Sequence, residues 1–83
     1  MFTIKCCKRS GLMHVYEAED WTLHPPGLDA NDEMVTTVEH TSARGNIIQH
    51  HVAYPHDVFY AEIFIENANG RTIEVIRPKP PKD

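Results

Sequence analysis

Six histidines are the residues of this 83-residue chain that most readily suggest chemistry, because imidazole is the commonest protein ligand of transition metals. They are His14, His24, His40, His50, His51 and His56. A metal site needs three or four ligands around one ion. The chain contains no His-x-His pair, no His-Glu-x-x-His motif and no paired Cys-x-x-Cys spacing. The sequence therefore favours histidines that lie at the surface or serve as hydrogen-bonded structural groups.

One metal site stays open as an alternative. If strands bring them together, His14, His40 and His50 can converge on an ion, with Glu39 or Cys6 as a further ligand. The chain would then be a histidine-based metal-binding protein or a metal-dependent enzyme. The leading interpretation includes no metal and no cofactor.

Other catalytic arrangements are weakly supported. Cys6 or Cys7 beside His14 would be a nucleophile and a base, but no third group that would orient them is evident. The four glycines are isolated and each is explained by a turn, so no phosphate-binding loop is predicted. A thin domain of this size also has little room for a ligand pocket. We therefore expect that the chain is not an enzyme.

Charge is unevenly distributed along the chain. Residues 1–9 are basic, residues 10–43 carry acidic side chains and neither lysine nor arginine, and residues 44–83 are balanced. Since a phosphate-binding surface needs clustered lysine and arginine, this distribution disfavours nucleic acid as a partner. We expect the acidic portion to bind a protein, with Trp21 as an apolar anchor. The candidate partner-binding residues are Glu17, Glu19, Asp20, Trp21, Asp29, Asp32 and Glu33.

The elements that position these residues are predicted to be strands. Apolar and polar residues alternate through much of the chain, and no stretch shows helical periodicity. We predict one all-β domain over residues 1–77, a small barrel or sandwich of about six antiparallel strands built from hairpins with little or no helix. The expected strands cover residues 2–8, 12–18, 34–40, 46–53, 58–66 and 71–77. Residues 20–33 are expected to form a long loop, and the proline-rich residues 78–83 an extended or disordered tail.

Register can be predicted for two hairpins. In the first, a three-residue loop at residues 9–11 would pair Ile4 with Tyr16 and Cys6 with His14. In the second, a three-residue loop at residues 68–70 would place Gly70 in the left-handed conformation. The second loop would then pair Ile65 with Ile73, Ile63 with Val75 and Glu66 with Thr72, because this register puts apolar residues on one face.

The second hairpin also has an apolar opposite face. Tyr60, Phe64 and Ile76 lie there, and they predict a second packed layer, the interface of a homodimer, or a surface that binds a different protein. A small nucleic-acid-binding barrel, using aromatic side chains for stacking, is a further alternative.

No stretch reaches the ~20 apolar residues that a membrane span requires. The first residues, MFTIKCCKR, reverse the charge order of a secretory signal, so we expect a reducing cytoplasm and two free thiols. The resulting hypothesis is a small non-enzymatic protein-interaction module that acts through an acidic surface. Its general character suits an accessory or inhibitor protein of a phage or other mobile element.

Overall fold

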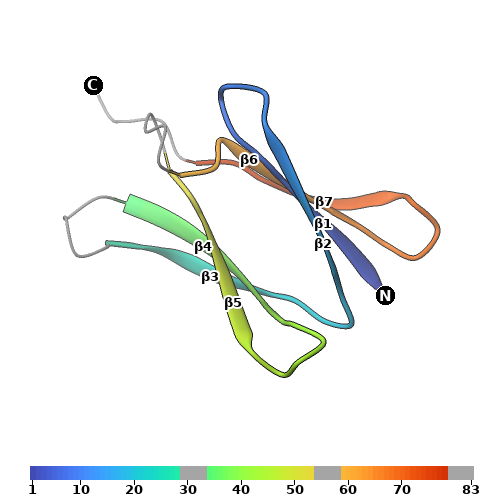
Figure 1. Cartoon of the computed structure of the whole chain (residues 1–83). Helices are drawn as coiled ribbons and strands as arrows, with labels where there is room; N and C mark the ends of the chain where they lie inside the picture. Colours follow the sequence, from blue (N-terminus) through green and yellow to red (C-terminus); the bar gives the residue numbers. More distant parts are fainter. Residues whose placement is uncertain (29–33, 54–58, 79–83) are drawn as a thin grey trace.

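The computed structural model describes residues 1–28, 34–53 and 59–78, and two antiparallel sheets account for most of them (Figure 1). The four-stranded sheet has the order β2-β1-β6-β7, with β1 (Phe2–Cys7), β2 (Met13–Ala18), β6 (Glu62–Glu66) and β7 (Thr72–Ile76). The three-stranded sheet has the order β3-β4-β5, with β3 (Thr22–Leu28), β4 (Met34–Thr41) and β5 (Ile47–Val52). These residues include no helix, and hence none that could cross a membrane. The predicted all-β class is confirmed.

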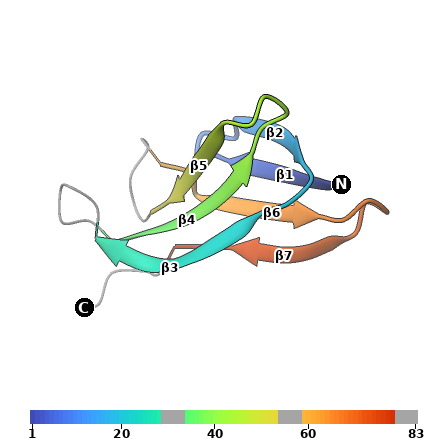
Figure 2. The same cartoon turned by 90° about the horizontal axis from the view of Figure 1, so that it is seen from below.

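The two sheets pack against each other with the hydrophobic core between them (Figure 2). Buried and exposed side chains alternate along the strands, and every second side chain points to the same face of a sheet. Each sheet therefore has a buried face, and the two buried faces pack against each other. The core takes side chains from both sheets: Ile4, Cys6, Ala18, Ile63, Ile65 and Ile76 from one, and Val38 and Val52 from the other. The described strands remain in two separate sheets, so the architecture is a sandwich and not a closed barrel.

Three hairpin loops have the same three-residue form. In each, a glycine N–H donates to the carbonyl three residues earlier: Gly11 to Lys8, Gly45 to Ser42, and Gly70 to Asn67. All three glycines have positive φ, between 79° and 96°, which a residue with a side chain rarely adopts. The predicted loops at residues 9–11 and 68–70 are confirmed. So is the first hairpin's register, with Ile4 opposite Tyr16 and Cys6 opposite His14.

The register of the second hairpin was predicted wrongly beyond its first pair. Glu66 does face Thr72, but Ile65 faces Glu74 and Ile63 faces Ile76. The ladder shifts by one residue between Ile65 and Glu66, which leaves Ile73 as an extra residue in a β-bulge. Ile76 is therefore buried in the core, whereas Ile73 and Val75 are 45% and 37% exposed.

The prediction of a long loop over residues 20–33 was also wrong. Residues 22–28 form β3, which pairs with β4 and is interrupted by a register shift between His24 and Gly27. Pro25 and Pro26 lie within that irregularity, where a missing N–H is tolerated. The strand expected to begin at residue 58 begins at Glu62. Residues 29–33, 58 and 79–83, on which other expectations fall, lie outside the described residues.

Candidate functional site

Two histidines from the three-stranded sheet form a buried pair. His40 on β4 and His50 on β5 are only 5% and 4% exposed, and their rings stack with centroids 5.0 Å apart and planes 15° apart. Their Nε2 atoms are 2.9 Å apart, within hydrogen-bond distance. The two residues are diagonal neighbours on one face, because His40 faces Ile48 and His50 faces Val38. The pair points into the space between the sheets.

The hydrogen bond between these rings fixes their tautomers. One Nε2 must donate and the other must accept. The Nδ1 atom of His40 is buried and has no partner within the described part of the chain. A buried N–H without an acceptor is rarer than a buried acceptor without a donor. We therefore assign the donor Nε2–H to His40 and the accepting Nε2 to His50, which carries its own proton on Nδ1.

Aromatic side chains from β2 and from the segment before β6 lie around the pair. The Tyr16 ring on β2 lies 4.5 Å from the His50 ring and 5.6 Å from the His40 ring, measured between centroids. The Tyr60 ring lies 6.1 Å from the His50 ring, and its hydroxyl is 3.0 Å from Nδ1 of His14. Tyr60 is brought here by a bridge to Val52, in which its N–H donates to the carbonyl of His51. The three histidines of the metal hypothesis therefore lie in one aromatic cluster.

The pKa values of His50 and Tyr60 in this cluster are shifted toward the neutral forms of both side chains. Burial, followed by the neighbouring His40, His51 and His14, lowers the pKa of His50 to about 4. Burial likewise raises the pKa of Tyr60 to about 12. Near neutral pH, the His50 ring is therefore an uncharged hydrogen-bonding group.

The geometry does not bring these histidines together as metal ligands. The Nε2 atoms of His40 and His50 are hydrogen-bonded to each other, and His14 is bonded to the Tyr60 hydroxyl. The residues described contain no group of three or more His, Cys, Asp or Glu side chains able to hold an ion. Glu39 and Cys6, the further ligands considered, do not join the pair: Glu39 bonds to Gln49 and Cys6 belongs to the core.

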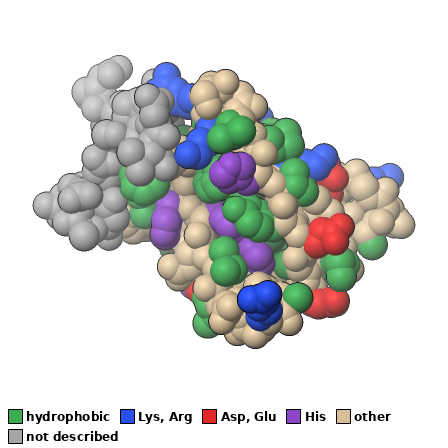
Figure 3. All heavy atoms as spheres, in the orientation of Figure 1, with side chains coloured by type: hydrophobic (Ala, Val, Ile, Leu, Met, Phe, Trp, Pro, Cys, Tyr) green, Lys and Arg blue, Asp and Glu red, His purple; other side chains and the backbone are tan. Residues whose placement is uncertain are grey.

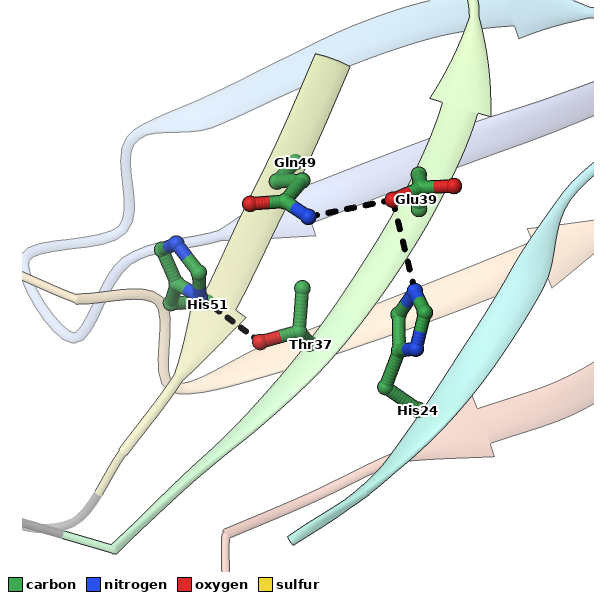
Figure 4. Close-up of polar contacts among 5 residues, drawn as sticks. All are labelled: His24, Thr37, Glu39, Gln49 and His51. Atoms are coloured by element: carbon green, nitrogen blue, oxygen red, sulfur yellow. Dashed lines mark hydrogen bonds and ion pairs between the residues drawn. The ribbon is translucent and has the colours of Figure 1, made fainter. Parts of the chain in front are cut away.

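Two other histidines belong to a polar network on the outer face of the three-stranded sheet (Figure 4). Nδ1 of His51 is 2.8 Å from the Thr37 hydroxyl. The Glu39 carboxylate accepts a 3.0 Å hydrogen bond from Gln49 and is 3.4 Å from Nε2 of His24. These contacts lower the pKa of Glu39, the Gln49 bond most. As expected from their adjacency, His50 and His51 point to opposite faces.

The cysteines offer no activated nucleophile. Cys6 does face His14 across the β1–β2 ladder, but its thiol is fully buried. Burial, followed by the neighbouring Cys7, raises the pKa of Cys6 to about 12. Burial and Glu62 also raise the pKa of Cys7. Because the thiolate is the reactive form, both thiols are poorly suited to nucleophilic catalysis near neutral pH.

The acidic residues lie where β2 ends. Glu17, Glu19 and Asp20 are exposed. Trp21 is half-buried against the core and contacts Phe2 edge to face, with ring centroids 6.4 Å apart. Its ring is thus partly committed to packing. Three further candidates, Asp29, Asp32 and Glu33, lie outside the described residues.

The three residues predicted to share an apolar outer face do not do so. Ile76 is buried in the core, and Tyr60 packs against the core beside the histidines. Phe64 faces Val75 and Lys5 on the outer face of the four-stranded sheet. The bulge at Ile73 accounts for Ile76, which it turns inward, and Tyr60 lies before β6 and is bridged to Val52.

A surface depression of about 420 Å³ opens over the histidine cluster. We call it the aromatic depression; it is lined by Tyr16, Ile48, Gln49, His50, His51, Phe59 and Tyr60. The sequence analysis did not connect Tyr16 or Phe59 with any site. These residues come together only through the packing of the two sheets, which the pattern of neighbouring residues in the sequence does not indicate. Comparison with known proteins found no matching family model, no similar curated protein and no similar solved structure.

Proposed function

We propose that this chain is a non-catalytic protein-interaction domain that binds an extended, basic segment of a partner along β2. The observation that carries the proposal is that β2 is an edge strand with exposed apolar side chains. Among the described strands it pairs with β1 alone, it exposes 49% of Met13 and 54% of Val15, and it is followed by exposed carboxylates. A small accessory or inhibitor protein of a phage or other mobile element, working in the cytoplasm, would use such a surface.

The backbone of β2 supports strand addition. The Lys8 N–H donates to the Leu12 carbonyl at 2.8 Å, which sets the alternation of hydrogen-bonded pairs along the ladder. The N–H and C=O groups of Met13, Val15 and Glu17 then point away from β1, toward the free edge. An extended segment of another protein could pair with these groups.

The other edge strands carry features that oppose such pairing. β3 contains Pro25 and Pro26, which have no N–H to donate. β7 contains the bulge at Ile73, which interrupts a regular edge. β5 is bridged by Tyr60 at its end. Within residues 1–28, 34–53 and 59–78, β2 is therefore the edge best suited to pairing.

The exposed acidic residues at the end of β2 indicate that the proposed partner segment is basic. Glu17, Glu19 and Asp20 are exposed at the end of β2 and form hydrogen-bonding and electrostatic complements to lysine or arginine. Desolvated contacts with Met13 and Val15 would supply apolar burial, while the carboxylates would direct orientation and speed association. This combination supports a basic segment with alternating apolar side chains.

A proline in β2 tests the strand-addition step. Val15→Pro removes an N–H that faces the free edge and leaves the β1–β2 ladder unbroken, so the domain should stay folded. We expect the variant to bind the partner about tenfold more weakly or worse, because it loses a backbone hydrogen bond and the Val15 side chain. The partner would be obtained by affinity capture from the native host and identified by mass spectrometry. A folded Val15→Pro variant with unchanged affinity would refute pairing along β2.

A charge reversal tests the acidic end separately. Glu19→Lys should weaken binding about fivefold and reduce its dependence on salt, since an attraction becomes a repulsion. Glu74→Lys is the matched control, because Glu74 is also exposed but lies on β7. Titration calorimetry at two salt concentrations measures both effects. Equal losses for the two variants would show that only net charge matters.

A further inference from the structure

The aromatic depression has the side chains of a binding site. It shares β2 with the proposed edge, because Tyr16 lines it, but the proposed pairing uses the backbone of Met13, Val15 and Glu17. His50 forms its floor and is 4% exposed, while Tyr16, Phe59 and Tyr60 are half-buried around it. Gln49 and His51 add hydrogen-bonding groups at the margin. Three half-buried aromatic rings beside a buried polar ring make a surface suited to a flat, polar ligand.

The orientations of the rings favour a planar ligand. The Tyr16 ring is tilted 36° from the His50 ring, and the His51 ring is nearly perpendicular, at 88°, to the Phe59 ring. The walls therefore present both faces and edges toward the depression. Nucleobases are planar ligands of this kind, and any of them can stack on such rings because every nucleobase has a π-face.

The charges around the depression indicate which planar ligand fits. None of the described residues that line it is acidic, and Nζ of Lys8 lies 6.0 Å from the centroid of the Tyr60 ring. In Figure 3, lysine and arginine side chains lie above and below the histidines on this face, and the acidic side chains lie to one side. The floor is uncharged near neutral pH because burial keeps His50 neutral. An uncharged ring with an attached anion fits this distribution better than a cation does.

We propose that the aromatic depression binds a nucleotide, with the base among Tyr16, Phe59 and Tyr60 and the phosphate beside Lys8. The neutral His50 ring would hydrogen-bond to an edge of the base. A free nucleotide and a nucleotide of a single-stranded nucleic acid offer the same base and phosphate. The sequence disfavoured nucleic acid on overall charge, but the structure gathers aromatic rings and a cation on one face.

The test is an NMR titration of the complete chain with AMP, UMP, adenosine, inorganic phosphate and a short single-stranded oligonucleotide. We expect saturable shifts of the Tyr60, Phe59 and His51 signals with the nucleotides. Phe59→Ala should weaken binding about tenfold through lost stacking, and Lys8→Ala about threefold through the lost cation. Val75→Ala and Arg71→Ala, which change exposed residues of the β6–β7 hairpin outside the depression, serve as matched controls.

Each outcome decides the matter. An oligonucleotide that binds about tenfold more tightly than AMP, with affinity falling as salt rises, would support the proposal and identify a nucleic-acid strand as the source. Similar affinities would support it with a free nucleotide. The proposal is overturned if neither ligand gives saturable shifts at low salt, if phosphate alone reproduces them, or if folded Phe59→Ala binds as wild type does.

Discussion

Acidification from neutral pH to about 4 should lower the free energy of unfolding by about 3 kcal/mol, through His50 alone. The reason is the buried position of this ring between the sheets. Its pKa is about 4 in the folded chain against 6.5 for an ordinary histidine. In a small domain, a loss of this size is a large share of the total stability. Urea denaturation at a series of pH values measures it.

The direction follows from proton binding. Between pH 6.5 and about 4, the unfolded chain binds a proton at His50 and the folded chain does not. Stability therefore falls as the pH falls through this window, and His50 causes no further loss below it. Among the described residues, those that contact His50 or act on its charge are His40, His51, His14, Tyr16 and Tyr60, and these include no carboxylate that would stabilise the protonated ring.

A substitution isolates this contribution. His50→Gln keeps a side chain that can accept the hydrogen bond from His40 but does not titrate, so its stability should depend less on pH in this window. His24→Gln changes a histidine on the outer face of β3 and leaves His50 in place, so the loss of stability that His50 causes should remain. If His50→Gln and wild type lose the same stability on acidification, the buried pair is not the cause.

Ile76→Asp should destabilise the domain far more than Val75→Asp. Ile76 is 4% exposed in the core, and an unpaired carboxylate buried there costs about 3–5 kcal/mol. Val75 is 37% exposed on the outer face, so its replacement should cost about 1 kcal/mol or less. Without the bulge at Ile73 the order would reverse, because Val75 would face the core. Urea unfolding of both variants decides between these registers, and a larger loss in Val75→Asp would contradict the bulge.

The sequence predicts much of this fold because alternation and turn chemistry are local properties. Ile4 and Cys6 alternate with polar neighbours, and Gly11 and Gly70 mark three-residue loops, so β1, β2 and their register could be derived. The bulge could not be predicted, because a single extra residue leaves both possible registers with apolar side chains on each face. β3 was missed because Pro25 and Pro26 normally end a strand.

The candidate site was less predictable, since it depends on contacts between the sheets. Adjacency correctly separated His50 from His51, and the set His14, His40 and His50 does lie in one cluster. These histidines are not arranged as metal ligands, because His40 and His50 are hydrogen-bonded to each other and His14 is bonded to Tyr60. These hydrogen bonds depend on packing. Tyr16 and Phe59 reach this place from distant parts of the chain, which spacing in the sequence does not record.

The central claim is that His50 is a neutral ring, hydrogen-bonded to His40 of the same sheet, and that it forms the floor of the aromatic depression. A ¹H–¹⁵N NMR experiment that follows the ring nitrogens of each histidine with pH tests this claim most directly. The account predicts that His50 keeps its proton on Nδ1 and stays neutral until the pH approaches about 4. It also predicts that addition of zinc leaves these nitrogen signals unchanged. A His50 ring that titrates near 6.5, or shifts on binding zinc, would contradict it.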